Sequence, residues 1–309
     1  MKTLFQFLLI FFAISLYAQE KKYEEYYFNT TDSLRIYVKE SLSKSTDTVI
    51  VLHGGFGANN DYMLDATKNL ENDFHFVYFD QRGSLMSEPS AKEKSLTFDK
   101  NVEDIFSLMQ ELRIRKAKFF CHSMGTLVGM EFLKKHPEMV KNMVLVSAIA
   151  PYSEKENTKN DRLSEQVKFL MNRPEVQKLL KPLEEKKNPT AREKTQIWRI
   201  KFASVNTFQI EKSIKNIKGG MAYYNQRVGN IMPKTVNWNF DYRDVLNRNG
   251  KVTVIYGAYD FIDFKGEKYR EQIKNYQNID FRLIGNSGHN IWSDEPEIFQ
   301  KELKRALSK

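Results

Sequence analysis

The sequence predicts an α/β protein in which a mostly parallel central sheet is flanked by helices and carries an inserted helical cap. Apolar, strand-like segments alternate with amphipathic helical segments in the first half of the chain, and the alternation resumes after residue 250. Residues 152–240, between these parts, show helical periodicity but no clear strand. Such alternation is typical of parallel strands joined by helical crossovers, and the strand-free stretch indicates an insertion.

The first half supplies the start of the predicted sheet. Strands are expected over residues 24–40, 48–52, 74–80 and 140–148. Helices are expected over residues 62–71 and 99–114. The second helix carries apolar residues at helical spacing, namely Val102, Ile105, Phe106, Met109 and Leu112. Strands and helices therefore alternate up to Pro151.

The insertion is expected to contain four helical segments, at residues 163–171, 175–183, 191–202 and 208–217. Residues that break helices are expected to interrupt it at Pro174, Pro182, Pro189 and Gly219-Gly220. The sheet resumes with strand-like residues 251–260 and 279–283, before a final helix over 295–307. We therefore predict a core of residues 19–151 and 241–309, and a helical cap over residues 152–240.

The segment Phe119-Phe120-Cys121-His122-Ser123-Met124-Gly125-Thr126 carries the strongest chemical signal. An apolar run ends there and a helical pattern begins, which predicts a strand, a sharp turn and a helix with Ser123 at the apex. A serine in this position exposes its Oγ above the sheet, and the N–H of Met124 lies at a helix N-terminus, where it can stabilise an oxyanion. Two nearby histidines, His53 and His122, are interpreted as residues that orient loops. We predict that Ser123 is a nucleophile.

A serine nucleophile needs a general base and an acid that orients this base. His289 lies in a glycine-bounded loop after the strand-like residues 279–283, and we predict that it is the base. Asp260 ends a β-branched run and is the predicted acid, with Asp263 as the alternative. The order Ser123, Asp260, His289 is the one expected of the α/β-hydrolase fold.

A second oxyanion donor is predicted in His53-Gly54-Gly55-Phe56-Gly57, which follows the buried strand 48–52. Glycines allow a tight turn and a close approach of backbone N–H groups to a ligand. We expect Gly55 or Phe56 to supply an N–H that acts together with that of Met124. The alternative is an ordinary glycine turn.

Five short segments together resemble α/β-hydrolases of the prolyl aminopeptidase (proline iminopeptidase) type, peptidase family S33. They are His53-Gly54-Gly55-Phe56-Gly57, Asp80-Gln81-Arg82-Gly83-Ser84, Ser123-Met124-Gly125, Gly257-Ala258-Tyr259-Asp260 and Gly288-His289. The resemblance implies Ser123 as nucleophile, Asp260 as acid and His289 as base, beneath a cap that selects the substrate. The sequence departs from the family pattern at Phe56, which replaces a proline, at Leu85, which replaces a glycine, and at Cys121, which replaces the first elbow glycine.

These residues predict a serine hydrolase that works through an acyl-enzyme. The resemblance implies an aminopeptidase acting on small peptides, and the alternative is a carboxylesterase or lipase-like enzyme acting on small acyl esters. Aminopeptidases of this family use cap glutamates to hold the substrate ammonium, but no cap glutamate matches that motif: Glu165, Glu175, Glu184, Glu185, Glu193 and Glu211. A third interpretation, a non-catalytic binding protein on this fold, is disfavoured by the complete set of catalytic residue types.

The N-terminus indicates an exported protein. Lys2 precedes an apolar run over residues 4–16, and the small residue Ala18 precedes a polar stretch. This pattern is typical of a secretory signal peptide over residues 1–18, and the alternative is an uncleaved N-terminal anchor. We expect cleavage after Ala18, a mature chain that starts at Gln19, a periplasmic or extracellular location, and no stable membrane insertion after cleavage.

Charge and residue types limit the expected partners to a small molecule or a short peptide. Residues 151–240 hold 18 Lys and Arg against 9 Asp and Glu, an excess equal to the net charge of +9. We interpret this excess as a solvated basic surface, and the alternative is a weak contact of the cap with an anionic surface. Neither nucleic acid, metal nor cofactor is expected, because no corresponding motif is present. The single cysteine, Cys121, excludes an intramolecular disulfide.

Overall fold

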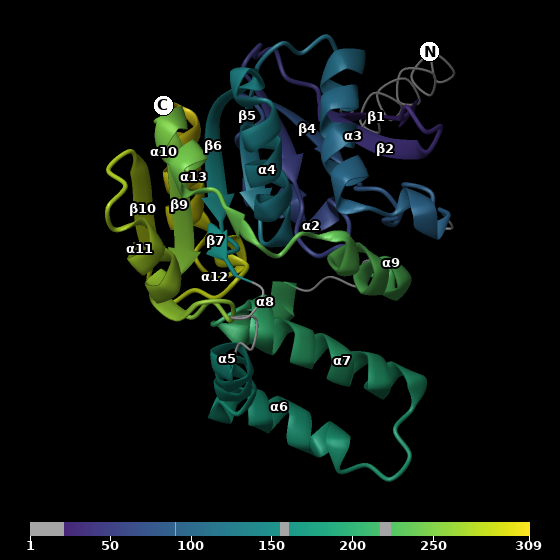
Figure 1. Ribbon diagram of the computed structural model, residues 1–309. Helices are drawn as coiled ribbons and strands as arrows, with labels where there is room; N and C mark the ends of the chain where they lie inside the picture. The colour runs from purple at the N-terminus through teal and green to yellow at the C-terminus, as the bar shows by residue number, and fades with distance from the viewer. Residues whose placement is uncertain (1–21, 90, 155–160, 217–223) are drawn as a thin grey trace, which may run out of the picture.

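An eight-stranded sheet forms the centre of the protein in the computed structural model, which describes residues 22–89, 91–154, 161–216 and 224–309 (Figure 1). Its strand order is β1-β2-β4-β3-β5-β6-β9-β10. The strands are β1 (Tyr23–Asn29), β2 (Arg35–Ser41), β3 (Thr48–Leu52), β4 (His75–Phe79), β5 (Ala117–His122), β6 (Val140–Val146), β9 (Val252–Gly257) and β10 (Ile279–Ile284). Within this sheet the pairs β1–β2 and β2–β4 are antiparallel, and the other pairs are parallel. The mostly parallel α/β fold predicted from the sequence is therefore confirmed.

Helices cover both faces of this sheet. On one face lie α3 (Phe98–Glu111), α4 (Met124–Lys135), α10 (Arg243–Asn249) and α11 (Glu267–Ile273). On the other face lie α2 (Asp61–Thr67), α12 (Ile291–Asp294) and α13 (Pro296–Leu307). Successive residues of a strand point to opposite faces, so that in β3 Ile50 packs into the first core and Val51 into the second. Burial on both faces explains why the central strands β3 and β5 are mostly apolar.

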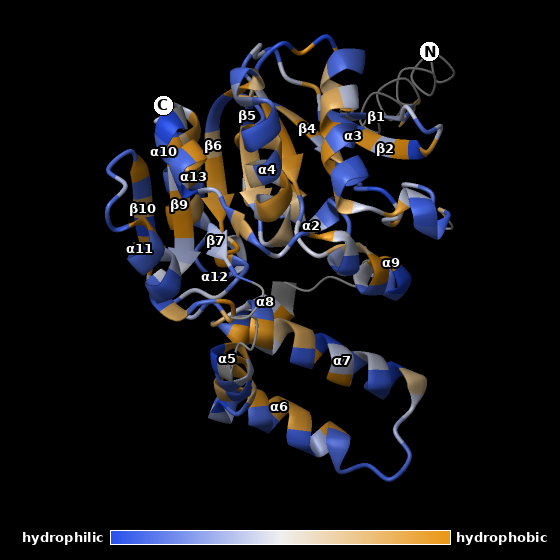
Figure 2. Cartoon of the chain, viewed as in Figure 1, coloured by the Kyte–Doolittle hydropathy of each residue, from blue (hydrophilic) through white to orange (hydrophobic). Residues whose placement is uncertain are grey.

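The cap helices lie beyond the carboxyl ends of the strands (Figure 1). They are α5 (Asp161–Met171), α6 (Pro174–Glu184), α7 (Ala191–Asn206) and α8 (Ile210–Asn216). A short antiparallel pair of strands, β7 (Tyr152–Ser153) and β8 (Phe240–Asp241), joins the two chain segments that enter and leave this region. The cap helices share a small core of their own, formed by Val176, Leu180, Ile200, Ala203 and Ile210. Along α6 and α7 polar residues are interspersed with apolar ones (Figure 2), and some of the apolar residues pack into this core, as in amphipathic helices.

Two details of the cap differ from the expectation. Pro182 does not separate two helices, because it lies inside α6, near its C-terminal end. The last part of the predicted cap, comprising α9 (Gln226–Ile231) and the 3₁₀ helix η4 (Met232–Thr235), contributes Val228 and Met232 to the main core and not to the core of the cap. Spatially, the separate cap therefore consists of α5–α8.

The remaining short elements are 3₁₀ helices: η1 (Glu93–Ser95), η2 (Pro137–Met139) and η5 (Phe264–Gly266). The predicted signal peptide over residues 1–18 and the expected break at Gly219-Gly220 lie outside the described residues. Within the described ranges, no helix combines the length and the apolar character that crossing a membrane would require.

Candidate active site

Ser123 lies at the turn between β5 and α4, as the sequence predicts. Its backbone has φ 53° and ψ −126°, in a region that non-glycine residues rarely adopt. Such strained conformations cluster at functional sites. The turn is possible because Gly125 packs against β3, where an added Cβ would lie 2.4 Å from the carbonyl oxygen of Leu52. The Ser123 residue is 8% exposed, so little of it is accessible to water.

His289 and Asp260 are brought together by the loops that follow β10 and β9. The Nδ1 atom of His289 lies 2.9 Å from Oδ1 of Asp260, and both side chains are buried. The same oxygen accepts a hydrogen bond from the backbone N–H of Ile262 at 3.0 Å. Because Nδ1 is engaged by the carboxylate, Nε2 of His289 remains available to accept a proton.

The alternative acid, Asp263, has a different set of partners. Its two carboxylate oxygens accept hydrogen bonds from the backbone N–H groups of Lys268 and Tyr269, at 3.2 and 2.9 Å. These donors lie in the first turn of α11, so Asp263 satisfies backbone groups at the start of this helix. Burial raises the pKa of Asp263. The structure therefore brings Asp260, and not Asp263, to His289.

His289 lies beside the residue that precedes Ser123, without a direct hydrogen bond to Ser123. His122, the residue before Ser123, lies with its ring centroid 4.6 Å from that of His289. Within the part of the chain that the structure describes, no hydrogen bond joins Ser123 Oγ to His289. Hydrogen bonds between nucleophile and base are often long before a substrate binds, and they shorten in the Michaelis complex.

The glycine-rich loop after β3 lies directly against Ser123. A Cβ added at Gly54 would lie 2.5 Å from the Cβ of Ser123, so no side chain fits at this position. Gly55 follows with φ 68°, and the ring of Phe56 packs edge-on against Phe98. In the described ranges, the N–H groups of Gly55, Phe56 and Met124 donate to no other protein group. These three groups are therefore available to an oxyanion.

Asn225 and α9 hold the glycine-rich loop in place, a role that the sequence pattern does not reveal. The N–H of Asn225 donates to the carbonyl of Gly57 at 2.7 Å, and its side-chain amide donates to the carbonyl of Gly83 at 2.8 Å. A Cβ at Gly57 would lie 2.4 Å from the carbonyl oxygen of Asn225. The only signal in the sequence is an asparagine before a short helical pattern. Asn225 and Gly57 are far apart in the sequence, so the sequence pattern does not predict their contact.

His53 connects the glycine-rich loop to the segment Asp80-Gln81-Arg82-Gly83-Ser84. Its Nε2 accepts a hydrogen bond from the N–H of Gln81 at 3.0 Å, so Nδ1 carries the proton and donates to the carbonyl of Gly54 at 3.0 Å. Burial lowers the pKa of His53, which keeps the ring neutral. The Gln81 side chain donates back to the His53 carbonyl at 2.7 Å. His53 therefore orients two loops, as interpreted from the sequence.

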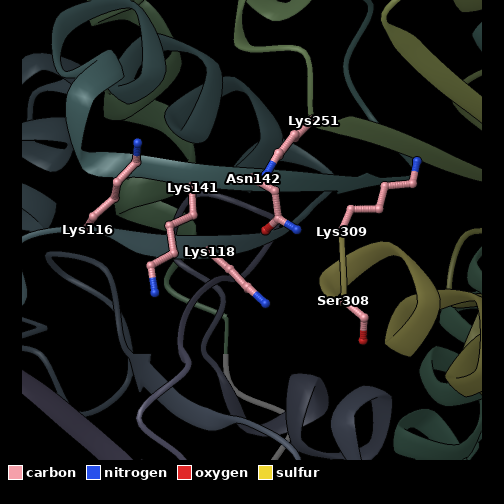
Figure 3. Close-up of a pocket in the computed structure, with 7 residues that line it drawn as sticks. All are labelled: Lys116, Lys118, Lys141, Asn142, Lys251, Ser308 and Lys309. Atoms are coloured by element: carbon pink, nitrogen blue, oxygen red, sulfur yellow. The ribbon is translucent and has the colours of Figure 1, made fainter.

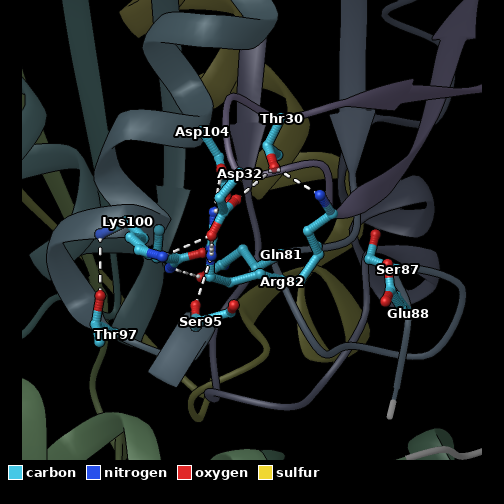
Figure 4. Close-up of polar contacts among 12 residues, drawn as sticks. Thr30, Asp32, Gln81, Arg82, Ser87, Glu88, Ser95, Thr97, Lys100 and Asp104 are labelled. Atoms are coloured by element: carbon cyan, nitrogen blue, oxygen red, sulfur yellow. Dashed lines mark hydrogen bonds and ion pairs between the residues drawn. The ribbon is translucent and has the colours of Figure 1, made fainter. Parts of the chain in front are cut away.

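Arg82 holds the same segment against α3 and the β1–β2 hairpin (Figure 4). Its guanidinium donates two hydrogen bonds to the carboxylate of Asp104, at 2.7 and 2.6 Å. It also donates to Asp32 at 3.2 Å and to the carbonyl of Ser95. Arg82 and Asp104 are each 2% exposed, so the pair is almost fully removed from water.

Replacement of Arg82 by methionine is expected to lower the free energy of unfolding by about 3–5 kcal/mol, because it leaves the buried Asp104 carboxylate without its partner. Lys274→Met is the matched control, since Lys274 forms an exposed ion pair with Glu271 and should change stability by less than about 1 kcal/mol. Urea unfolding of both variants measures the difference. Equal losses for the two variants would refute a structural role for the buried pair.

The cap is fixed to the loop of the predicted base through Asp294 in α12. Its carboxylate accepts hydrogen bonds at 2.8 Å from the N–H groups of Gly288, Phe208 and Gln209. The first donor precedes His289, and the other two lie between α7 and α8. Burial raises the pKa of Asp294, although these backbone hydrogen bonds act in the opposite direction. The Phe208 ring also stacks on Tyr259, the neighbour of Asp260, at 3.7 Å between centroids.

The cap glutamates do not contact the predicted catalytic residues in the described ranges. Glu193 caps α7 through Thr190, Glu184 pairs with Lys201, and Glu175 pairs with Arg173. The other three glutamates are exposed: Glu165, Glu185 and Glu211. Carboxylates that are paired or in water hold a substrate ammonium weakly.

A basic cavity of about 310 Å³ lies at the opposite end of the sheet, near the starts of β5 and β6. It is lined by Lys116, Lys118, Lys141, Asn142, Lys251, Ser308 and Lys309. The lysine ammonium groups point in different directions (Figure 3). Two of them pair with Asp47 and one pairs with Asp280. This cavity is therefore separate from the site at Ser123.

Among the described residues, no group of three or more His, Cys, Asp or Glu side chains is arranged so that it could hold a metal ion. Cys121 is buried, and burial raises the pKa of its thiol, which keeps it protonated. Its Sγ would lie 2.6 Å from a Cβ added at Gly129, so Cys121 packs tightly against α4.

Comparison with known proteins places this chain in a family. Residues 47–296 match the family of the alpha/beta hydrolase fold. A probable alcohol acetyltransferase of Cyberlindnera fabianii is 26% identical over 293 residues, 86% of this chain and 73% of that protein. The proline iminopeptidase of Neisseria gonorrhoeae is 33% identical over 131 residues, only 42% of each chain. A proline iminopeptidase-related protein of Thermus thermophilus has a similar structure, with a TM-score of 0.65, 21% identity and coverage of 93% of this chain and 97% of that one.

Proposed function

Because the chain belongs to the alpha/beta hydrolase fold family, we propose that it is a serine hydrolase that forms an acyl-enzyme on Ser123. The observation that carries this proposal is the 2.9 Å contact between His289 and the buried Asp260, next to a serine with a strained backbone. The family and the resemblance to proline iminopeptidases agree with the expectation from the sequence.

The proposed reaction has two halves. Ser123 Oγ attacks the acyl carbonyl while His289 Nε2 takes the serine proton, and the oxyanion accepts hydrogen bonds from Met124 and from Gly55 or Phe56. His289 then gives the proton to the leaving alcohol or amine, which departs and leaves the acyl group on Ser123. Water attacks this ester in the same manner, with His289 again as the base, and releases the acid. Asp260 keeps the ring oriented and stabilises the imidazolium in both halves.

We propose small, uncharged acyl esters as the preferred substrates. The predicted cap carries an excess of basic residues, and the six glutamates within residues 161–216 are paired, used as a helix cap or exposed. Aromatic side chains lie near the predicted acid and base instead: Phe261 lies 4.5 Å from the His289 ring, and Phe208 stacks on Tyr259. Apolar rings beside the predicted acid and base are suited to a small apolar acyl group.

The second candidate is an aminopeptidase of the proline iminopeptidase type acting on small peptides. Its support is the segment Asp80-Gln81-Arg82-Gly83 and the 33% identity to the gonococcal proline iminopeptidase. This match covers less than half of either chain. It therefore supports a shared catalytic chemistry more strongly than a shared substrate.

A comparison of short-chain aryl esters with aminoacyl arylamides tests the choice between these candidates. The esters are expected to have the higher kcat/KM, and Glu→Gln changes at the six cap glutamates should leave the ratio of the two activities within about threefold. An ammonium-binding glutamate would be worth ~1.5–3 kcal/mol, or roughly 10–150-fold in KM for a free-amine substrate. One glutamate variant with that selective loss would favour the aminopeptidase.

A further inference from the structure

We infer that Tyr62 and His122 are positioning residues, whose hydrogen bonds hold the oxyanion loop, the nucleophile turn and the loop of the base at fixed distances. This inference rests on the proposed function of Ser123 and His289. Tyr62 lies on α2, and His122 is the last residue of β5. Neither side chain has a step of its own in the proposed reaction, so any effect on catalysis is exerted through the groups that they hold.

The order of donors in this network follows from the chemistry of each group. The N–H of Gly54 can only donate, and it donates to Tyr62 Oη at 2.5 Å. The single hydroxyl proton of Tyr62 is then free for His122 Nδ1, which lies 2.9 Å away. With Nδ1 as an acceptor, the neutral ring carries its proton on Nε2, which lies 3.2 Å from the carbonyl oxygen of His289. One directed chain therefore connects Gly54 to His289.

Burial keeps the hydrogen-bonded groups between Gly54 and His289 in one protonation state. His122 is 2% exposed, and burial, together with the nearby His289 and His53, lowers its pKa well below the usual value. A protonated His122 would lose the acceptor that Tyr62 requires. The direction of the hydrogen bonds is therefore maintained throughout the neutral pH range.

Packing restricts the same three segments. A Cβ added at Gly54 would meet both Ser123 Cβ, at 2.5 Å, and Tyr62 Oη, at 3.1 Å. Trp292, three residues after His289, stacks on the Tyr62 ring at 6.0 Å and meets the His122 ring edge-on at 4.9 Å. The His289 carbonyl also accepts a hydrogen bond from Ser147 Oγ at 2.8 Å. Tyr62 and His122 thus occupy the point where all three loops meet.

We therefore expect Tyr62 and His122 to control the geometry in which the reacting groups meet in the transition state. The N–H donors of Gly55 and Phe56 follow Gly54 directly, and Ser123 follows His122 directly. A displacement of about 1 Å between reacting groups can cost 10²-fold in rate, even when the substrate still binds. Loss of the Tyr62 hydroxyl leaves both the Gly54 N–H and His122 Nδ1 without their partners, so these loops are free to shift.

Tyr62→Phe tests the inference. We expect kcat for a small aryl ester to fall ~10–100-fold and KM to stay within about threefold, with an equally slower rate of labelling by a fluorophosphonate probe. Tyr78→Phe is the matched control. It removes the hydroxyl of a buried tyrosine, which hydrogen-bonds at 2.6 Å to Thr67 on the helix that also carries Tyr62, α2. This control is expected to keep kcat within about twofold, with a comparable loss of thermal stability.

His122→Asn is a second variant, which tests the same inference if Tyr62→Phe does not fold. It is expected to keep an acceptor for Tyr62 and to lose the contact with the His289 carbonyl, so kcat should again fall at least ~10-fold with little change in KM. Wild-type kcat in both folded variants, or equal losses in Tyr62→Phe and Tyr78→Phe, would overturn the inference. A wild-type protein that neither hydrolyses esters nor reacts with the probe would instead refute the proposed function.

Discussion

Ser123→Ala is expected to abolish labelling by a fluorophosphonate probe and to lower kcat by ~10⁴–10⁶. The variant lacks the oxygen that would form the acyl-enzyme, so neither half of the proposed reaction can proceed through it. Residual turnover would come from the oxyanion donors and substrate binding alone. The comparison of probe labelling with steady-state rates on an aryl ester measures both effects in the same preparation.

The fold of this variant should be retained. Alanine removes one hydroxyl from a residue whose backbone hydrogen bonds, from its N–H to the Val146 carbonyl and from Thr126 to its own carbonyl, remain. Alanine can also adopt the strained backbone conformation that serine has at this position. Ser213→Ala is a suitable control, because Ser213 is another buried serine, located in the cap, and no partner of its Oγ lies among the described residues. Labelling that survives in Ser123→Ala but not in another serine variant would reassign the nucleophile.

The parts of the site that the sequence predicts best are those formed by local structure. The turn at Ser123 can be recognised because an apolar strand, a short turn and a helical pattern follow one another within a few residues. Asp260 and His289 can be recognised because each follows a strand-like run, and the carboxyl ends of parallel strands lie at one edge of a sheet. In the structure Asp260 and His289 are in contact.

The parts that the sequence does not predict depend on contacts between distant segments. Tyr62 resembles any half-buried residue of an amphipathic helix, and only the fold brings its hydroxyl to Gly54 and His122. Asn225 lies in a stretch without strong periodicity, and its role appears only when α9 packs on the glycine-rich loop. The predicted cap extends beyond α8 to residue 240 because the sequence shows no clear strand there, whereas in the structure α9 packs on the main core.

The effect of Asp260→Asn is expected to be a fall in kcat of roughly 10³–10⁴ with the fold intact. An asparagine amide can donate to Nδ1 of His289, which would place the imidazole proton on Nε2, where it blocks acceptance of the serine proton. The substitution also removes the negative charge that stabilises the imidazolium. Among the described residues, the Asp260 carboxylate contacts His289 and the N–H of Ile262, both at Oδ1, while Oδ2 has no hydrogen-bonding partner.

The matched control is Asp263→Asn, three residues away in the same loop. Asp263 accepts hydrogen bonds from the N–H groups of Lys268 and Tyr269, so its loss should lower stability by about 1 kcal/mol and leave kcat within about threefold of the wild type. Rates at saturating ester, together with urea unfolding of both variants, separate the two roles. A catalytic loss confined to Asp263→Asn would make Asp263 the acid. That result would also require the loop to move when substrate binds, because His289 contacts Asp260 in the present structure.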